Sequence, residues 1–123
     1  MKLRIQGNSL RLRVTQKEVA QLHDRNRVES SIEFGLGRTL VYKLEGSLRD
    51  TAVTSDFDGQ SICVTVPMRV MTEWIESDQV SIEALSQAGM QLLIEKDFQC
   101  LHKSDEQDPD AYPNPLANTM ACE

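Results

Sequence analysis

The fold is decided by residues 10–22, LRLRVTQKEVAQL, where a strand pattern changes into a helix pattern. Apolar and polar residues alternate over 9–14, which is typical of a half-buried strand. Thr15 and Glu18 then form a capping box, in which the hydroxyl accepts one backbone N–H and the carboxylate accepts another. We therefore expect a strand that is followed at once by a short helix over about 16–25.

The residues on either side of this stretch also read as strands. Residues 2–6 alternate in the same way, and Gly7 with Asn8 provides the two-residue loop of a β-hairpin. After the helix, residues 28–34 and 38–45 look like strands, and a glycine-containing turn over 35–37 separates them. The first part of the chain is therefore predicted to have the order ββαββ.

The second half of the chain has the same order of elements. ICVTVPMRVMTEW (62–74) again ends a strand pattern at a helix start, because Pro67 has the fixed φ that suits a first helical turn. Residues 68, 71 and 75 then carry apolar side chains at helical spacing. The other predicted strands of this half are 52–58, 79–84 and 90–98.

The two halves align when the chain is shifted by 52 positions. Six of the 39 pairs from residue 7 to residue 45 are then identical, whereas chance gives about two. The identical pairs fall at predicted turns and at predicted inward positions. They are Gly7/Gly59, Ser9/Ser61, Val14/Val66, Val28/Val80, Gly37/Gly89 and Leu40/Leu92. The alternative interpretation is two unrelated amphipathic stretches in chance register.

A single unit of this kind is too small to stand alone, since it buries too little apolar surface to offset its chain entropy. We therefore predict one α+β, mainly β domain made of two ββαββ units, about 1–50 and 51–102. The units would close around a pseudo-twofold axis as a β-barrel or sandwich with two short helices. Residues 103–123 would form an acidic, proline-containing tail.

Composition excludes several classes of protein. The net charge is −6, divided into +4 over residues 1–50 and −10 over 51–123, which argues against a protein that coats nucleic acid. No apolar run approaches the ~20 residues that span a bilayer, and no signal peptide is evident. Three cysteines without a CxxC motif fit a reducing, cytoplasmic location. Enzyme signatures are absent, so we expect no catalytic activity.

The first hairpin is the main candidate for binding. If its apolar residues face inward, Lys2, Arg4, Arg11 and Arg13 face outward, with Arg4 opposite Arg11 and Lys2 opposite Arg13. Like charges across a strand pair are destabilising, so the cluster predicts an anionic partner. An acidic protein surface or the chain's own tail is expected, and nucleic acid is an alternative. The cations could instead protect an edge from aggregation. We predict a regulatory or adaptor module, monomeric or homodimeric.

A second candidate lies at the end of the last predicted strand. Cys100 and His102 project to the same side of that strand and could supply two of the four ligands of a zinc ion. No other local residues provide the second pair, and no cofactor is otherwise expected. The same pair could support nucleophilic catalysis, or could be a buried cysteine and a strand-end histidine. In the tail, Tyr112 is predicted to anchor an acidic stretch near the first hairpin.

Each half resembles the AbrB-type swapped-hairpin module. The carrying segments are LRLRVTQKEVAQL, RVESSIEF and RTLVYKLE in the first half, and ICVTVPMRVMTEW, DQVSIEAL and MQLLIEKD in the second. The resemblance implies hairpins exchanged between two units and, in many members, DNA binding through basic residues. This chain would hold both units in one polypeptide. Its acidic second half departs from a symmetric DNA-binding pattern.

The whole chain also resembles a small bacterial family of uncharacterised proteins. The matching segments are MKLRIQGNSLRLRVTQKEV at 1–19, IEKDFQCLH at 94–102 and DAYPNP at 110–115. This resemblance implies no particular activity.

Overall fold

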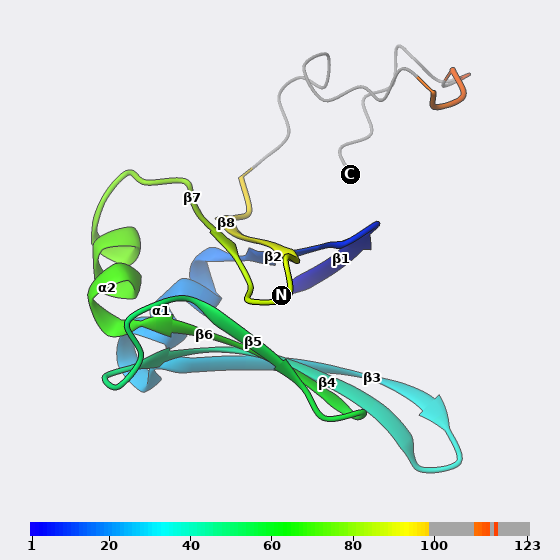
Figure 1. Cartoon of the computed structure of the whole chain (residues 1–123), viewed down its shortest axis with the longest axis horizontal. Coiled ribbons are helices and arrows are strands. Elements are labelled where there is room, and N and C mark those ends of the chain that lie inside the picture. The colour runs from blue at the N-terminus through cyan, green and yellow to red at the C-terminus, as the bar shows by residue number, and fades with distance from the viewer. Residues whose placement is uncertain (99–109, 114, 116–123) are drawn as a thin grey trace.

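The chain folds into two β-sheets that face each other, with two helices at one end (Figure 1). The computed structural model describes residues 1–98, 110–113 and 115. The elements in chain order are β1 (Lys2–Gln6), β2 (Ser9–Val14), α1 (Gln16–Arg25), β3 (Arg27–Gly35), β4 (Arg38–Ser47), β5 (Thr54–Phe57), β6 (Ser61–Pro67), α2 (Met68–Glu76), β7 (Ser81–Leu85) and β8 (Gln91–Lys96). The predicted mainly β composition with two helices is confirmed, and the expected helix over 16–25 matches α1.

The two sheets each have four strands, in the orders β1-β2-β8-β7 and β3-β4-β6-β5. Of the two predicted arrangements, barrel or sandwich, the closed barrel is wrong, because these are two separate sheets. Barrel closure requires each strand to have two neighbours, whereas β1, β7, β3 and β5 are edge strands here. The sheets therefore pack face to face and remain open at their edges.

Each sheet combines one hairpin from the first half of the chain with one from the second half. The strands of a hairpin are antiparallel, and the two hairpins of a sheet meet through a parallel pair. The parallel pair is β2 with β8 in one sheet and β4 with β6 in the other. As a result, neither half of the chain forms a complete sheet by itself.

The hairpins of the two halves pair in the same register when 52 is added to each residue number. Lys2 pairs with Arg13 in the first hairpin, and the corresponding residues Thr54 and Thr65 pair in β5–β6. Likewise Ser30 pairs with Tyr42, and the corresponding residues Ile82 and Ile94 pair in β7–β8. The register within each hairpin is thus the same in both halves.

The parallel pairs do not share this register. Leu10 lies opposite Leu92, which would correspond to Ile62 opposite Leu40, but Ile62 lies opposite Tyr42. This is a slide of two residues, and an even slide leaves every side chain on its original face. It moves the β3–β4 turn outward by about 7 Å at the usual rise of a strand. Residues 30–42 of this hairpin are called the arm, and within it residues 32–40 extend beyond the part of β4 that pairs with β6 (Figure 1).

The helices begin and end at the residues that the sequence indicates. Thr15 and Glu18 form the capping box at the start of α1, and Asn26 ends this helix in the left-handed conformation with φ of 64°. Pro67 directly precedes the first residue of α2, as expected for a residue that fixes φ at a helix start. Each helix directly follows a central strand, β2 or β6, and both helices cover the same end of the two sheets (Figure 1).

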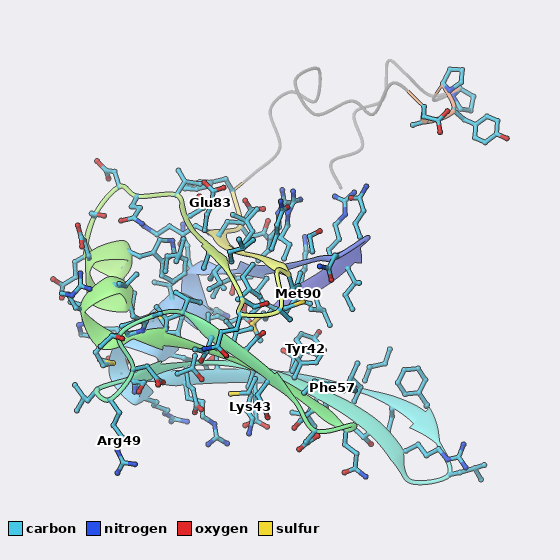
Figure 2. The ribbon with its side chains drawn as sticks, in the orientation of Figure 1. Tyr42, Lys43, Arg49, Phe57, Glu83 and Met90 are labelled. Atoms are coloured by element: carbon cyan, nitrogen blue, oxygen red, sulfur yellow. The ribbon has the colours of Figure 1, made fainter. Side chains whose placement is uncertain are left out.

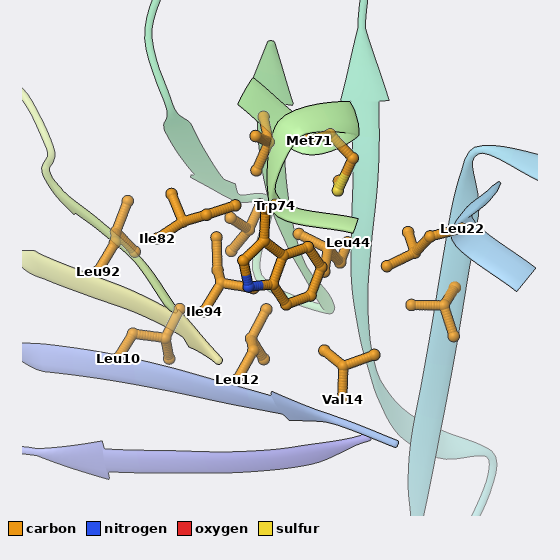
Figure 3. Close-up of a cluster of buried hydrophobic side chains, with 13 residues drawn as sticks. Leu10, Leu12, Val14, Leu22, Leu44, Met71, Trp74, Ile82, Leu92 and Ile94 are labelled. Atoms are coloured by element: carbon orange, nitrogen blue, oxygen red, sulfur yellow. The ribbon is translucent and has the colours of Figure 1, made fainter. Parts of the chain in front are cut away.

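The core lies between the sheets and under the helices, with Trp74 at its centre (Figure 3). Trp74 is fully buried, and its Nε1 donates a hydrogen bond to the carbonyl of Val80 at 3.1 Å. The buried apolar side chains come from both halves of the chain. They are Leu10, Leu12, Val14, Leu22, Val28, Leu44, Val64, Val66, Met71, Trp74, Ile82, Leu92 and Ile94.

One prediction about the tail is wrong. Tyr112 does not anchor it, because this side chain is 97% exposed. Of the acidic stretch 105–110, only Asp110 lies within the described residues, so the predicted position of this stretch near the first hairpin is not tested. Within the described part of the chain, neither helix has the length and apolar character needed to cross a membrane.

Candidate binding surfaces

The predicted basic hairpin forms with the expected register. Arg4 lies opposite Arg11, and Lys2 lies opposite Arg13. Leu10 and Leu12, which alternate with Arg11 and Arg13 along β2, are buried. Strand alternation therefore places the four cations on the outer face of the sheet.

Two carboxylates of the last strand region form ion pairs with three of these four cations. Glu95 Oε1 lies 2.8 Å from Arg13 Nε and 3.5 Å from Arg11 Nε. Asp97 Oδ2 lies 3.3 Å from Lys2 Nζ. The chain itself therefore supplies part of the negative charge that the cation cluster was predicted to attract.

These carboxylates could not be assigned from the local sequence, because Glu95 is 82 positions from Arg13. The parallel pairing of β2 with β8, which places Glu95 directly beside Arg13, brings them together. Among the described residues, Arg4 makes no ion pair and remains exposed. The outer face thus retains a small positive excess near Arg4 and Lys2.

A shallow depression lies on the same face, over β2, β8 and β7. Its lining includes Arg11, Glu83 and Leu93. Charges of opposite sign thus lie side by side with apolar groups, so the depression does not favour an anionic or a cationic ligand.

The predicted zinc ligands Cys100 and His102 lie outside the described residues. Within the described ranges, no group of three or more His, Cys, Asp or Glu side chains is placed to hold a metal. Cys63 is half-buried, and its thiol lies 3.3 Å from Glu45. Burial and this carboxylate raise the pKa of Cys63, which keeps the thiol protonated and weakly nucleophilic.

The arm carries an apolar surface that the sequence did not reveal as exposed. Directly paired residues share one face of a sheet, so the register defines this surface in two rows. The inner row crosses all four strands, and the outer row crosses the arm alone. These rows are Phe57–Ile62–Tyr42–Ser30 and Leu40–Ile32. Together with Phe34, which follows at the end of β3, they are called the arm face.

Only the inner part of the arm face, at Tyr42 and Ile62, packs against the core. The Tyr42 hydroxyl donates a hydrogen bond to the Met1 carbonyl at 3.1 Å, which ties this inner part to the start of the chain. Figure 2 shows Tyr42 on the side of Met90, while Lys43 points the opposite way. Ile32, Phe34 and Phe57 are 50%, 67% and 63% exposed. They lie on the core-facing side of the sheet but outside the core.

The edge of the arm is less suited to binding than its face. The β3–β4 register shifts between Glu33 and Gly35, so Phe34 lies at a β-bulge. A bulge twists an edge strand and interrupts its regular hydrogen-bonding groups, which opposes the addition of another strand. The apolar face is therefore the part of the arm that a partner would cover.

In the sequence the arm residues look like ordinary strand positions, since their alternation has the same form as that of core residues. The distinguishing information is the two-residue slide of β4 against β6, which depends on tertiary packing. The lengths of the predicted strands gave no signal, because 28–34 and 38–45 together contain as many residues as 79–84 and 90–98.

Comparison with known proteins places this chain in a family without assigning a function. No curated protein and no solved structure matches it. A family model, described as a family of unknown function, matches residues 1–116. This match covers nearly the whole chain, including both sheets and the arm. The chain therefore belongs to this family, DUF7009.

Proposed function

We propose that this chain is a non-catalytic protein-binding module, built from two copies of one swapped-hairpin unit, which binds a protein partner through the arm face. The observation that carries the proposal is the exposure of Ile32 and Phe57 on one face of the sheet, together with the exposure of Phe34 at the bulge next to Ile32. Contiguous exposed apolar side chains are uncommon on monomeric proteins and mark interaction sites.

The internal duplication is supported by the pairing register. Both hairpins of the first half have counterparts in the second half at an offset of 52, with the same residues opposite each other. The strand orders also correspond, since renumbering β1-β2-β8-β7 by this offset produces β5-β6-β4-β3. These observations favour two copies of one ββαββ unit over a chance resemblance of two amphipathic stretches.

The AbrB-type resemblance is supported by the exchange of hairpins. Each sheet takes one hairpin from each half and joins them through a parallel pair. The resemblance implies DNA binding, but the outer face of the first hairpin is largely paired with Glu95 and Asp97. A DNA-binding surface needs cations that are free to replace the counterions of phosphate. We therefore prefer a protein partner.

A second candidate surface is the exposed pair of cations at the edge of the first hairpin. Lys2 is 68% exposed in its side chain, and Arg4 is exposed directly opposite Arg11. This arrangement favours a weak contact with an acidic protein surface. We assign it a supporting role, because exposed ion pairs contribute little free energy and are screened by salt.

A photocrosslinking amino acid at the position of Phe34 tests the proposed function. With the full chain expressed in its native cell, we expect a crosslinked protein product that disappears when Ile32 and Phe57 are both replaced by serine. The matched control places the same crosslinker at Leu85, a strand residue of similar exposure on the other sheet. Absence of any product specific to position 34 would refute protein binding by the arm face.

A further inference from the structure

We infer that the partner of the arm face is a second copy of this chain, so that two arms stack face to face around a twofold axis. This inference rests on the proposed function and specifies its partner. Three properties of the arm face support it, namely its area, its lack of charge and its position on a projecting hairpin.

The exposed apolar area fits the core of a dimer interface. Ile32, Phe34 and Phe57 together leave roughly 400 Å² of side-chain surface uncovered, from their exposed fractions and the usual area of such residues. A stable interface covers about 800 Å² per partner, of which roughly 60% is apolar. The half-buried neighbours Leu40 and Ile62 add apolar area at the border. The arm face thus supplies most of the apolar part that a homodimer needs.

The arm face is uncharged, which matters for a chain with a net charge of −6. Its two rows contain only apolar residues, a tyrosine and a serine. Strand alternation places Glu33 and Lys43 on the opposite face. Two acidic copies could therefore approach through this surface without placing like charges in contact. An apolar, uncharged face is also complementary to itself, as a twofold interface requires.

The position of the arm makes this stacking feasible. The arm extends past the strands of the facing sheet, and its turn at Gly35–Gly37 lies farthest from the helices (Figure 1). Two such hairpins can pack with their faces about 10 Å apart, which is the usual distance between stacked sheets. The bulge at Phe34 opposes edge-to-edge pairing, so stacking is favoured over strand addition.

Sedimentation equilibrium of the purified full chain tests the inference. We expect a dimer whose dissociation constant rises at least tenfold in the double variant Ile32→Ser/Phe34→Ser. Both side chains are exposed, so the core and the fold should be preserved, which circular dichroism checks. The control Leu85→Ser removes an equally exposed apolar side chain elsewhere and should leave the dissociation constant unchanged.

Two outcomes would overturn the inference. One is a wild-type chain that remains monomeric at every concentration tested, and the other is a dimer that the Ile32→Ser/Phe34→Ser variant does not weaken. The crosslinker at position 34 separates this failure from failure of the proposed function. A product with twice the mass of the chain supports the homodimer. A product containing a different protein refutes the homodimer but retains protein binding, and the absence of a product refutes both.

Discussion

The Nε atom of Arg13 lies 2.8 Å from Oε1 of Glu95, so an ion pair joins the first hairpin to β8. Their side chains are 23% and 16% exposed, which limits screening by water. The same carboxylate oxygen lies 3.5 Å from Arg11 Nε. Glu95 is thus a shared anion between two arginines of β2 and holds the outer face of this sheet close to neutral.

Replacing Glu95 with glutamine should leave Arg11 and Arg13 without this shared anion. We expect the free energy of unfolding to fall by about 1 kcal/mol, because these are partly buried, charge-assisted contacts. Retention on a polyanion column at low salt should increase. Urea titration and column elution measure the two effects, and Glu83→Gln on the same sheet is the control. Unchanged elution for Glu95→Gln would show that the arginines do not form an anion-binding surface.

The core and the loops should respond very differently to loss of a leucine side chain. Leu44 is fully buried and Leu48 is 91% exposed, although they are four residues apart. We expect Leu44→Ala to lower the free energy of unfolding by about 2–5 kcal/mol through lost burial and a cavity. Leu48→Ala should change it by less than about 0.5 kcal/mol. Chemical denaturation compares them, and equal effects would contradict the placement of β4 in the core.

Gly46 is required by the close approach of Asn26. A Cβ at this position would lie 2.4 Å from Asn26 Oδ1 and 2.4 Å from Met68 Sδ. The Met68 side chain is flexible, but Asn26 is held by a hydrogen bond from its Nδ2 to the Gly46 carbonyl at 3.0 Å. We expect Gly46→Ala to destabilise the protein by about 1–3 kcal/mol.

Asn26→Gly should partly restore the stability of Gly46→Ala. Glycine accepts the left-handed conformation of Asn26 and removes the obstructing amide. The double variant should therefore be more stable than the sum of the single effects indicates. Thermal denaturation of the four proteins measures this coupling, and strict additivity would mean that the clash is relieved elsewhere.

The stability of the chain should depend on pH through Glu18. Burial alone would raise the pKa of Glu18, but hydrogen bonds from the N-terminal ammonium and from Thr15 outweigh burial and lower it below its ordinary value of 4.5. A carboxyl with a lowered pKa in the folded state contributes stability above its ordinary pKa. This contribution is lost as the pH falls through the folded value.

Glu18→Gln should therefore flatten the acid side of the stability profile. The variant should be less stable than wild type near pH 7, and the difference should shrink as the pH falls below about 4.5. Urea titrations between neutral pH and pH 3 provide the comparison. A difference that stays constant over this range would show that ionisation of Glu18 is not coupled to folding.

Local patterns predicted the elements well. Alternation around Gly7 and Asn8 defined the first hairpin and its register, and the capping box at Thr15 defined the start of α1. These features depend on residues close together in the chain, where backbone geometry and side-chain spacing decide the result. Strand ends were less accurate, as in β7, which begins at Ser81 and not at residue 79.

The pairing of hairpins from the two halves of the chain could not be predicted in the same way. The shared anion Glu95 depends on β8 pairing with β2, and the exposure of Ile32 depends on how far β4 slides along β6. Both are long-range relations between strands whose own patterns are equally compatible with other partners. The sequence therefore indicated the cations but not their counterions, and the apolar arm residues but not their exposure.

The slide of β4 along β6 means that the two parallel strand pairs of this molecule differ in register. In an assembly of two identical chains, any substitution is made twice, so both parallel contacts must keep the same register. Here a single polypeptide contributes both contacts, and Ile62 meets Tyr42 while Leu10 meets Leu92. One hairpin of this chain can therefore extend farther than the other, which two identical chains in a symmetric assembly could not arrange.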